Sequence, residues 1–375
     1  MTNRELTYDR ITNLVNNILR EPRHPSISEE RFNGAQEVLR VLNEAKIFWI
    51  DEMTLDSLIN QPYSVEDFED FEFRLPFPVM FFDLSTPLDY RFLEDRVKDT
   101  GFKIGGLLVN DTQQGYMADR TRERGISVRG YRADSGIPVV KTTFLEDRPF
   151  YIIEYPLKQV KRELSYDLNY YVLYPRERKL AKVNLGPEDT YHLSREEIEN
   201  RIEFEKDFNI QDDDCLDAFK IVNLAVNTIN YVNAQNIVIR EQRRTREEKI
   251  RVGRGKERHL ERIRVELRPY YWVEVKKVYI DRERRDGEPE WTVNCRFWVR
   301  GHNRHFRNED GRERYHVWVE PYVKGPEDAP WKNNRYEILW KRFRPLFENP
   351  QLRRGPWAMR EIQRELEDIR EEEGR

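Results

Sequence analysis

Residues 291–325, WTVNCRFWVRGHNRHFRNEDGRERYHVWVEPYVKG, decide how the C-terminal part of this chain folds. Aromatic residues alternate with Arg and His on both sides of the pair Asp310-Gly311. Period-two alternation around an Asp-Gly turn predicts a β-hairpin. Pro321 has no backbone N–H to donate, so it predicts an edge position or the end of the pairing.

The alternation also predicts which side chains share a face, because successive residues of a strand point to opposite sides. On the first strand one face is expected to hold Trp298, Arg300, His302, Arg304 and Phe306, and the other face Phe297, Val299, Gly301 and Asn303. On the return strand one face is expected to hold His316, Trp318 and Glu320, and the other Tyr315, Val317 and Val319.

Two interpretations of this hairpin stay open. Three of the six histidines, His302, His305 and His316, lie here, and Arg and His among aromatics offer stacking surfaces, cationic donors and groups that titrate near neutral pH. Alternatively, the polar face is solvated and the aromatics pack on a core. A glycine weakens a strand unless a bulge or a close backbone approach needs it, which favours a specific role for Arg300-Gly301-His302.

Length and composition limit the class of protein. A chain of 375 residues allows two or three domains, and 36% charged against 38% hydrophobic residues indicates a soluble globular protein. The net charge of −4 argues against a protein that coats DNA through its overall charge, although local basic patches remain possible. The abundance of Arg and Glu resembles the composition of proteins from hot environments.

The sequence shows no zinc or redox motif, no cofactor motif and no membrane span. Cys215 and Cys295 are far apart and form no CxxC pair, so we expect two buried thiols in a reducing compartment. No apolar run is long enough to cross a membrane and no signal peptide is visible, so we expect a cytoplasmic protein. The acidic segments 66–72 and 212–214 are interpreted as a solvated segment and as the first turn of a helix, with metal binding as the sharper alternative.

The first half of the chain predicts a mixed α+β domain. Apolar residues at helical spacing predict helices over 7–21, 28–42, 55–59, 193–208 and 213–234. Apolar runs predict strands at 75–84, 101–109, 126–131, 138–144, 149–155, 168–174 and 180–185. The helix at 213–234 is the most apolar in the chain and is expected to join the two halves.

Residues 240–268 are strongly basic. They contain twelve Lys and Arg and six Glu, which gives a formal charge of +6. One interpretation is a solvated linker that is most flexible at Gly253 and Gly255. The other is a basic surface that binds RNA, a ribosomal surface or an acidic partner. On the second interpretation, Arg243, Arg244 and Arg246 are candidate binding residues.

The sequence therefore predicts an α+β protein: N-terminal helices with a mixed, largely antiparallel sheet, a long central apolar helix and a small C-terminal antiparallel β module. The expected boundaries are an α+β domain at 1–210, the apolar helix at 211–239, a charged basic linker at 240–268, the β-hairpin module at 269–345 and a polar helical tail at 346–375.

Four segments carry a resemblance to a known family. They are Arg300-Gly301-His302 with the return Trp318-Val319-Glu320-Pro321, the strand from Leu75-Pro76 to Asp83-Leu84, the glycine-led Gly106–Val109, and the apolar Leu224–Ile237 before the basic stretch. In their order they resemble the family of the second type V-A anti-CRISPR protein and its relatives in phages and plasmids. The similarity spans most of the length at low identity.

The chain departs from the family pattern at two positions. Asn303 stands where the family usually has an aromatic residue, and Phe297 stands where a His often precedes the glycine by four residues. The resemblance implies a mobile-element protein that acts in a bacterial cytoplasm against CRISPR immunity. It implies binding to the nascent N-terminal segment of the type V-A effector nuclease, with loss of the encoding message, so that production of the nuclease falls.

The residues themselves support two further hypotheses. A plain RNA- or DNA-binding module would use the arginines, Trp298 and Trp318 for stacking, and Gly301 and His316 are further candidate binding residues. A metal-independent ribonuclease would use His302 or His305 for proton transfer and Arg300 or Arg304 to stabilise the charge on the phosphorane. No nucleotide-binding loop, zinc site or nucleophile elbow is visible, so no cofactor is expected, and a binding protein is favoured over an enzyme.

Overall fold

The computed structural model of this protein describes residues 6–20, 29–61, 75–90, 102–111, 125–145, 150–154, 157–160, 163–166, 169–174, 179–183, 202–203, 216–252, 259–276, 294–310 and 313–354. Its helices are α1 (Thr7–Arg20), α2 (Glu29–Glu44), α3 (Glu52–Asn60), α6 (Leu216–Asn233) and α7 (Asn334–Glu348), followed by the short 3₁₀ helix η2 (Pro350–Arg354). None of these helices is long and apolar enough to cross a membrane.

One sheet of eleven strands organises the described residues, in the order β11-β10-β9-β6-β5-β4-β3-β2-β1-β13-β12. Its strands are β1 (Lys46–Ile50), β2 (Val79–Tyr90), β3 (Phe102–Asp111), β4 (Gly125–Arg132), β5 (Pro138–Leu145), β6 (Phe150–Glu154), β9 (Asn169–Tyr174), β10 (Lys179–Val183), β11 (Ile202–Glu203), β12 (Ile237–Val252) and β13 (His259–Val275). Strand β1 pairs in parallel with β2 and β13, and the other neighbours pair antiparallel. The α+β class and the largely antiparallel sheet predicted from the sequence are confirmed.

Both faces of the sheet are covered, which explains the continuous apolar runs of its central strands. Phe48 and Ile50 of β1 enter one core with α3 and α6, while Ile47 and Trp49 enter a second core with α1, α2 and α7. Strand β2 alternates in the same way between the two cores. Strand β1 was not predicted, because a five-residue strand between two helices carries too little periodic signal.

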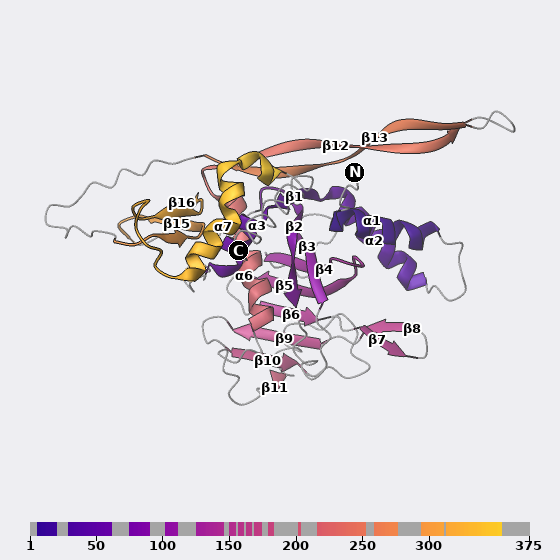
Figure 1. Cartoon of the computed structure of the whole chain (residues 1–375). Coiled ribbons are helices and arrows are strands. Elements are labelled where there is room, and N and C mark those ends of the chain that lie inside the picture. Colours follow the sequence, from indigo (N-terminus) through magenta and orange to yellow (C-terminus); the bar gives the residue numbers. More distant parts are fainter. Residues whose placement is uncertain are drawn as a thin grey trace.

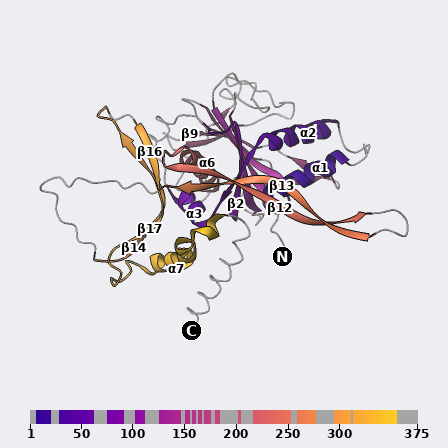
Figure 2. The same cartoon turned by 90° about the horizontal axis from the view of Figure 1, so that it is seen from above.

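The predicted basic linker at 240–268 is wrong. Residues of this stretch lie in β12 and β13, which form a long antiparallel pair from Ile237↔Val275 to Val252↔His259. We call the part beyond the bulge at Gln242/Arg244 the ribbon, residues 244–252 and 259–267. It extends away from the body of the molecule (Figures 1 and 2). Cross-strand pairing of β-branched and long charged side chains stabilises it, and composition alone did not reveal this pairing.

The predicted domain boundaries also change around the ribbon. Strand β13 belongs to the main sheet, so the C-terminal module does not begin at 269. Within the apolar segment expected as a helix over 211–239, the described residues are helical in α6 up to Asn233, and the chain has entered β12 by Ile237. The segment expected as a helix over 193–208 is described only at 202–203, where it forms strand β11.

The C-terminal part contains two small sheets and a helix. Strands β15 (His302–Arg307) and β16 (Glu313–Val319) form the predicted hairpin, while β14 (Phe297–Val299) pairs separately with β17 (Tyr322–Lys324). A further pair, β7 (Leu157–Val160) and β8 (Glu163–Tyr166), lies outside the main sheet. Helix α7 falls within the segment expected to be a β module, and its Trp340 and Phe343 face Trp298.

The predicted first strand of the hairpin is interrupted at Arg300-Gly301, and the expected faces change there. Trp298 and Asn303 are both buried, although continuous alternation would place them on opposite faces. The acidic segments 66–72 and 212–214, Cys215, Gly253, Gly255 and the expected tail helix at 357–373 lie outside the described residues.

Candidate nucleic-acid interface

The Arg300-Gly301-His302 segment lies against helix α3. The Nε of Arg300 donates to Oδ2 of Asp56 at 3.0 Å, and the backbone N–H of Gly301 donates to the hydroxyl of Ser57 at 3.0 Å. The backbone N–H of Asn303 donates to Oε1 of Gln61 at 3.1 Å. These three bonds join the C-terminal hairpin to the main body, so the triplet forms a structural joint.

Gly301 is required at this joint because the surrounding atoms leave no room for a side chain. A Cβ at this position would lie 2.6 Å from Cζ2 of Trp318 and 3.1 Å from both the ring of Pro321 and the hydroxyl of Ser57. The predicted close backbone approach is therefore present, and it is made to the protein's own core.

The two tryptophans proposed as stacking platforms are core residues, so that prediction is wrong. Trp298 is 4% exposed, with its ring 6.0 Å from those of Trp340 and Phe343. Trp318 is 2% exposed and meets Tyr231 of α6 edge to face at 4.8 Å. Neither ring has a free face for a base, because burying these apolar rings stabilises the contact between the hairpin and the helices.

The three histidines of the hairpin are divided between its two faces. His302 and His305 are three residues apart in one strand, so their side chains point to opposite faces of the hairpin. Nδ1 of His302 donates to the carbonyl oxygen of Arg300 at 3.0 Å, and Nε2 of His316 donates to that of Asn230 at 2.8 Å. His305 lies opposite His316, with ring centroids 5.4 Å apart.

Arg304 is the exposed member of the predicted hairpin site. Its guanidinium lies 5.3 Å from the ring of Phe306, a cation–π contact within β15. Among the described residues no group of three or more His, Cys, Asp or Glu is placed to hold a metal ion.

The three arginines predicted on the basic stretch have different surroundings. Arg244 forms an ion pair with Asp9 of α1 at 2.7 Å, and both side chains are largely buried, so Arg244 ties the base of the ribbon to the body. Arg243 is exposed at the bulge. Arg246 lies opposite Val265 in the ribbon.

The ribbon has a cationic face that composition and periodicity did not predict. Residues directly opposite each other in an antiparallel pair share a face, so the pairs Thr245↔Glu266, Glu247↔Arg264 and Lys249↔Arg262 line one side. We call this side the cationic face; its formal charge is +3 − 2 = +1. The side chains of Lys249, Arg262 and Arg264 are exposed, and none of them forms an ion pair with another residue in the described part of the chain. The strand register, once known, would have revealed this face.

A second cluster of charges, at the C-terminal end of the described chain, is structural. Arg353 of η2 donates to Oε1 of Glu320 at 2.6 Å and to the hydroxyl of Thr54 at 3.1 Å, and its Nε lies 3.4 Å from Oδ1 of Asp51. Burial alone would lower the pKa of Arg353, but the carboxylates of Asp51 and Glu320 outweigh it and raise that pKa. Burial also raises the pKa of Tyr231 beside this cluster. Both groups therefore keep their protons at neutral pH, and the contacts of Arg353 with Thr54 and Asp51 hold η2 against α3.

The predicted site residues fall into two groups: residues that connect the C-terminal hairpin to the body, and exposed cations on the ribbon. The fold is stabilised by the contacts of Arg300, Gly301, Trp298, Trp318 and His316. The cations of the ribbon, in contrast, face solvent. No protein-family model, curated protein or solved structure matches this chain.

Proposed function

We propose that this chain binds RNA through the cationic face of the ribbon and that this binding suppresses production of a type V-A CRISPR effector nuclease in a bacterial cytoplasm. The suppressive role rests on the resemblance of Arg300-Gly301-His302 and the three other segments to the anti-CRISPR family. The contact surface rests on one observation: Lys249, Arg262 and Arg264 are exposed on one side of a ribbon that extends from the body (Figure 2).

The physical basis of the proposal is the release of counterions. A strand of RNA carries condensed cations, and a protein cation that replaces them gains free energy that falls as salt is added. A ribbon of two strands is narrow, so a single strand can follow its length with phosphates against one face. The low net charge of the whole chain, −4, restricts such binding to this local surface.

The first experiment measures retention of a labelled single-stranded RNA at increasing salt. The variant Lys249→Gln/Arg262→Gln/Arg264→Gln removes three cations from the cationic face, and the control Lys324→Gln/Lys332→Gln/Arg344→Gln removes three exposed cations elsewhere. The ribbon variant is expected to reduce the slope of log K against log salt by about 2, since each phosphate contact contributes about 0.7 on single strands. Equal slopes for the ribbon variant and the control would refute the proposal.

The second experiment tests the suppressive role. A type V-A system that interferes with plasmid transformation is assayed with and without this gene, and the level of the effector nuclease is measured in parallel. We expect the level of the nuclease and of its message to fall with the wild-type chain and to recover with the ribbon variant. Unchanged interference and unchanged nuclease level would exclude the anti-CRISPR role for this chain.

The other side of the ribbon favours a second candidate, binding of the nascent nuclease itself. Ile263, Val265 and Leu267 are half-buried on this side, and β12 is the last strand of the sheet in the described part of the chain. An extended polypeptide can add to such an edge and place alternate side chains on an apolar face. The variant Val265→Asp would then weaken capture of a synthetic N-terminal peptide of the nuclease while leaving RNA retention unchanged; equal capture by both proteins would exclude this candidate.

A further inference from the structure

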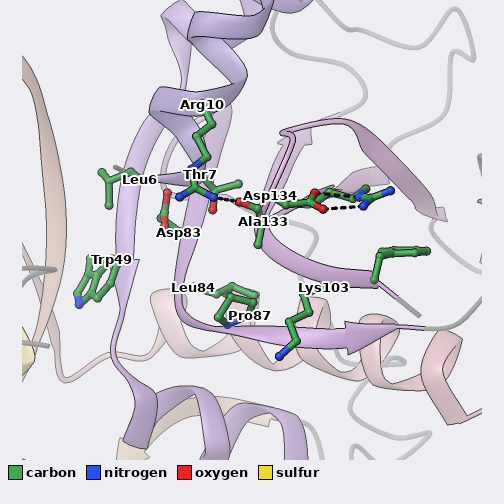
Figure 3. Close-up of a pocket in the computed structure, with 12 residues that line it drawn as sticks. Leu6, Thr7, Arg10, Trp49, Asp83, Leu84, Pro87, Lys103, Ala133 and Asp134 are labelled. Carbon is green, nitrogen blue, oxygen red and sulfur yellow. Dashed lines mark hydrogen bonds and ion pairs between the residues drawn. The ribbon is translucent and has the colours of Figure 1, made fainter. Parts of the chain in front are cut away.

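The described part of the chain contains a cavity of about 320 Å³ whose lining includes no residue of the ribbon. It lies between the beginning of α1, the middle of β2, the beginning of β3 and the end of β4 (Figure 3). In this view Leu84, Pro87 and Lys103 lie along one side, facing Arg10, Ala133 and Asp134 on the other. This volume is at the lower end of the range for small-molecule sites.

The cavity exists because two adjacent strands are irregular at the same place. Between Asp83 and Leu88, β2 advances five residues while β3 advances only two, from Gly106 to Ile104. The register between β3 and β4 also shifts, between Ile104 and Gly106. Bulges of this kind locally open a sheet and are frequent beside functional sites.

Gly105 fixes the back wall of the cavity. A Cβ at this position would lie 2.5 Å from the hydroxyl of Thr7 and 2.8 Å from Cα and Cβ of Ala133. The beginning of α1 and the end of β4 therefore approach β3 as closely as backbone allows. The walls come from the beginning of α1, from β1, β2 and β3, and from the end of β4, which are held together by contact, so the cavity is preformed.

The charges that line the cavity have an excess of cations. Arg10, Lys103 and Arg132 face Asp83 and Asp134, which leaves +3 − 2 = +1. Asp134 accepts two hydrogen bonds from Arg132, at 2.9 and 2.6 Å, and Asp83 accepts the backbone N–H of Tyr8 at 3.1 Å. Both carboxylates are thus already held by donors of the protein.

Lys103 is the cation that a ligand can engage most easily. Its Nζ lies 3.8 Å from Asp89, and the two side chains are 65% and 86% exposed, so this ion pair contributes little. The apolar part of the lining, Leu6, Leu84, Pro87 and Phe102, offers contact to a hydrocarbon body. The lining is therefore complementary to a molecule with an apolar ring and an anionic group.

We propose that this cavity is a binding site for a small organic anion, a carboxylate or phosphate monoester carried on a single apolar ring. The anionic group lies at Lys103, and the ring contacts Leu84 and Pro87. The site is independent of the RNA-binding surface, since no lining residue belongs to β12 or β13.

The experiment is a calorimetric and thermal-shift titration of the full chain with four probes of similar size: benzoate, phenyl phosphate, benzyl alcohol and benzylamine. The two anions are expected to bind and to raise Tm as their concentration rises, because a ligand that binds only the folded state stabilises it. Benzyl alcohol and benzylamine are expected not to bind. Equal binding of all four probes, preference for benzylamine, or no binding of either anion would overturn the proposal.

Two variants locate the site. Lys103→Gln is expected to weaken binding of the anions about tenfold, because a hydrogen bond to a charged group is lost; the control Lys324→Gln removes an exposed cation of β17 and should bind as the wild type does. Ala133→Leu fills the cavity and is expected to abolish binding of benzoate while RNA retention persists. Wild-type affinity in either of the two site variants would overturn the assignment.

Discussion

The guanidinium of Arg300 donates to the carboxylate of Asp56 across a sequence separation of 244 residues, with Nε and Oδ2 3.0 Å apart. This ion pair connects the most unusual triplet of the sequence to helix α3, which lies on the main sheet. It explains why Arg300, Gly301 and His302 occur together in the hairpin without forming an exposed reactive site. The charge of Arg300 and the backbone N–H of Gly301 hold two parts of the chain together.

The first prediction concerns this pair. Arg300→Gln and Asp56→Asn are each expected to lower the free energy of unfolding by about 1 kcal/mol, a modest value because both side chains are partly exposed, at 29% and 23%. Urea denaturation of both single variants and the double variant gives the coupling between them. A coupling energy near zero would show that the pair does not hold the joint.

The second prediction concerns Gly301. Gly301→Ala is expected to lower the free energy of unfolding by about 2 kcal/mol, since its Cβ would press on the buried ring of Trp318, which has no space to move. Thermal and urea unfolding measure the loss. Arg304→Ala, an exposed change in the same hairpin, serves as the control and is expected to change stability by less than about 0.5 kcal/mol.

The third prediction concerns the cluster around Arg353. Arg353→Met leaves Asp51 and Glu320 near each other without their shared cation, and we expect a loss of about 3 kcal/mol in the free energy of unfolding. The matched control is Arg344→Met, which breaks an exposed ion pair with Glu348 and is expected to cost about 0.4 kcal/mol. Similar losses in the two variants would contradict a structural role for Arg353.

The fourth prediction concerns pH. The hydrogen bonds from Arg132 lower the pKa of Asp134 from its ordinary value of 3.8, so the folded state favours the ionised carboxylate. The contribution of Asp134 to stability is therefore present above that ordinary value and is lost as pH falls through the lower folded pKa. Because Asp134 is largely exposed, Asp134→Asn is expected to cost only about 0.5 kcal/mol at neutral pH.

The measurement that checks this is the free energy of unfolding of wild type and Asp134→Asn between neutral pH and pH values below 3.8. The difference between the two proteins is expected to shrink toward zero as the acid limit is reached. A difference that stays constant over this range would mean that the carboxylate of Asp134 does not titrate with folding.

The sequence by itself determined the elements whose signal is local. The alternation around Asp310-Gly311 predicted the hairpin of β15 and β16, and the apolar runs predicted β2 and β3, because side-chain period and turn residues are properties of neighbouring positions. The position of Gly301 indicated a close backbone approach before the residues that cause it were known.

Only the tertiary structure decided which side chains are exposed. Trp298 and Trp318 are buried because α7 and α6, both distant in the sequence, cover their rings. The basic stretch is a ribbon because its two halves pair with each other across residues 253–258, and its cationic face follows from that register. Burial and strand register depend on contacts between residues far apart in the chain. Composition and periodicity do not predict those contacts, because they describe only residue content and neighbouring positions.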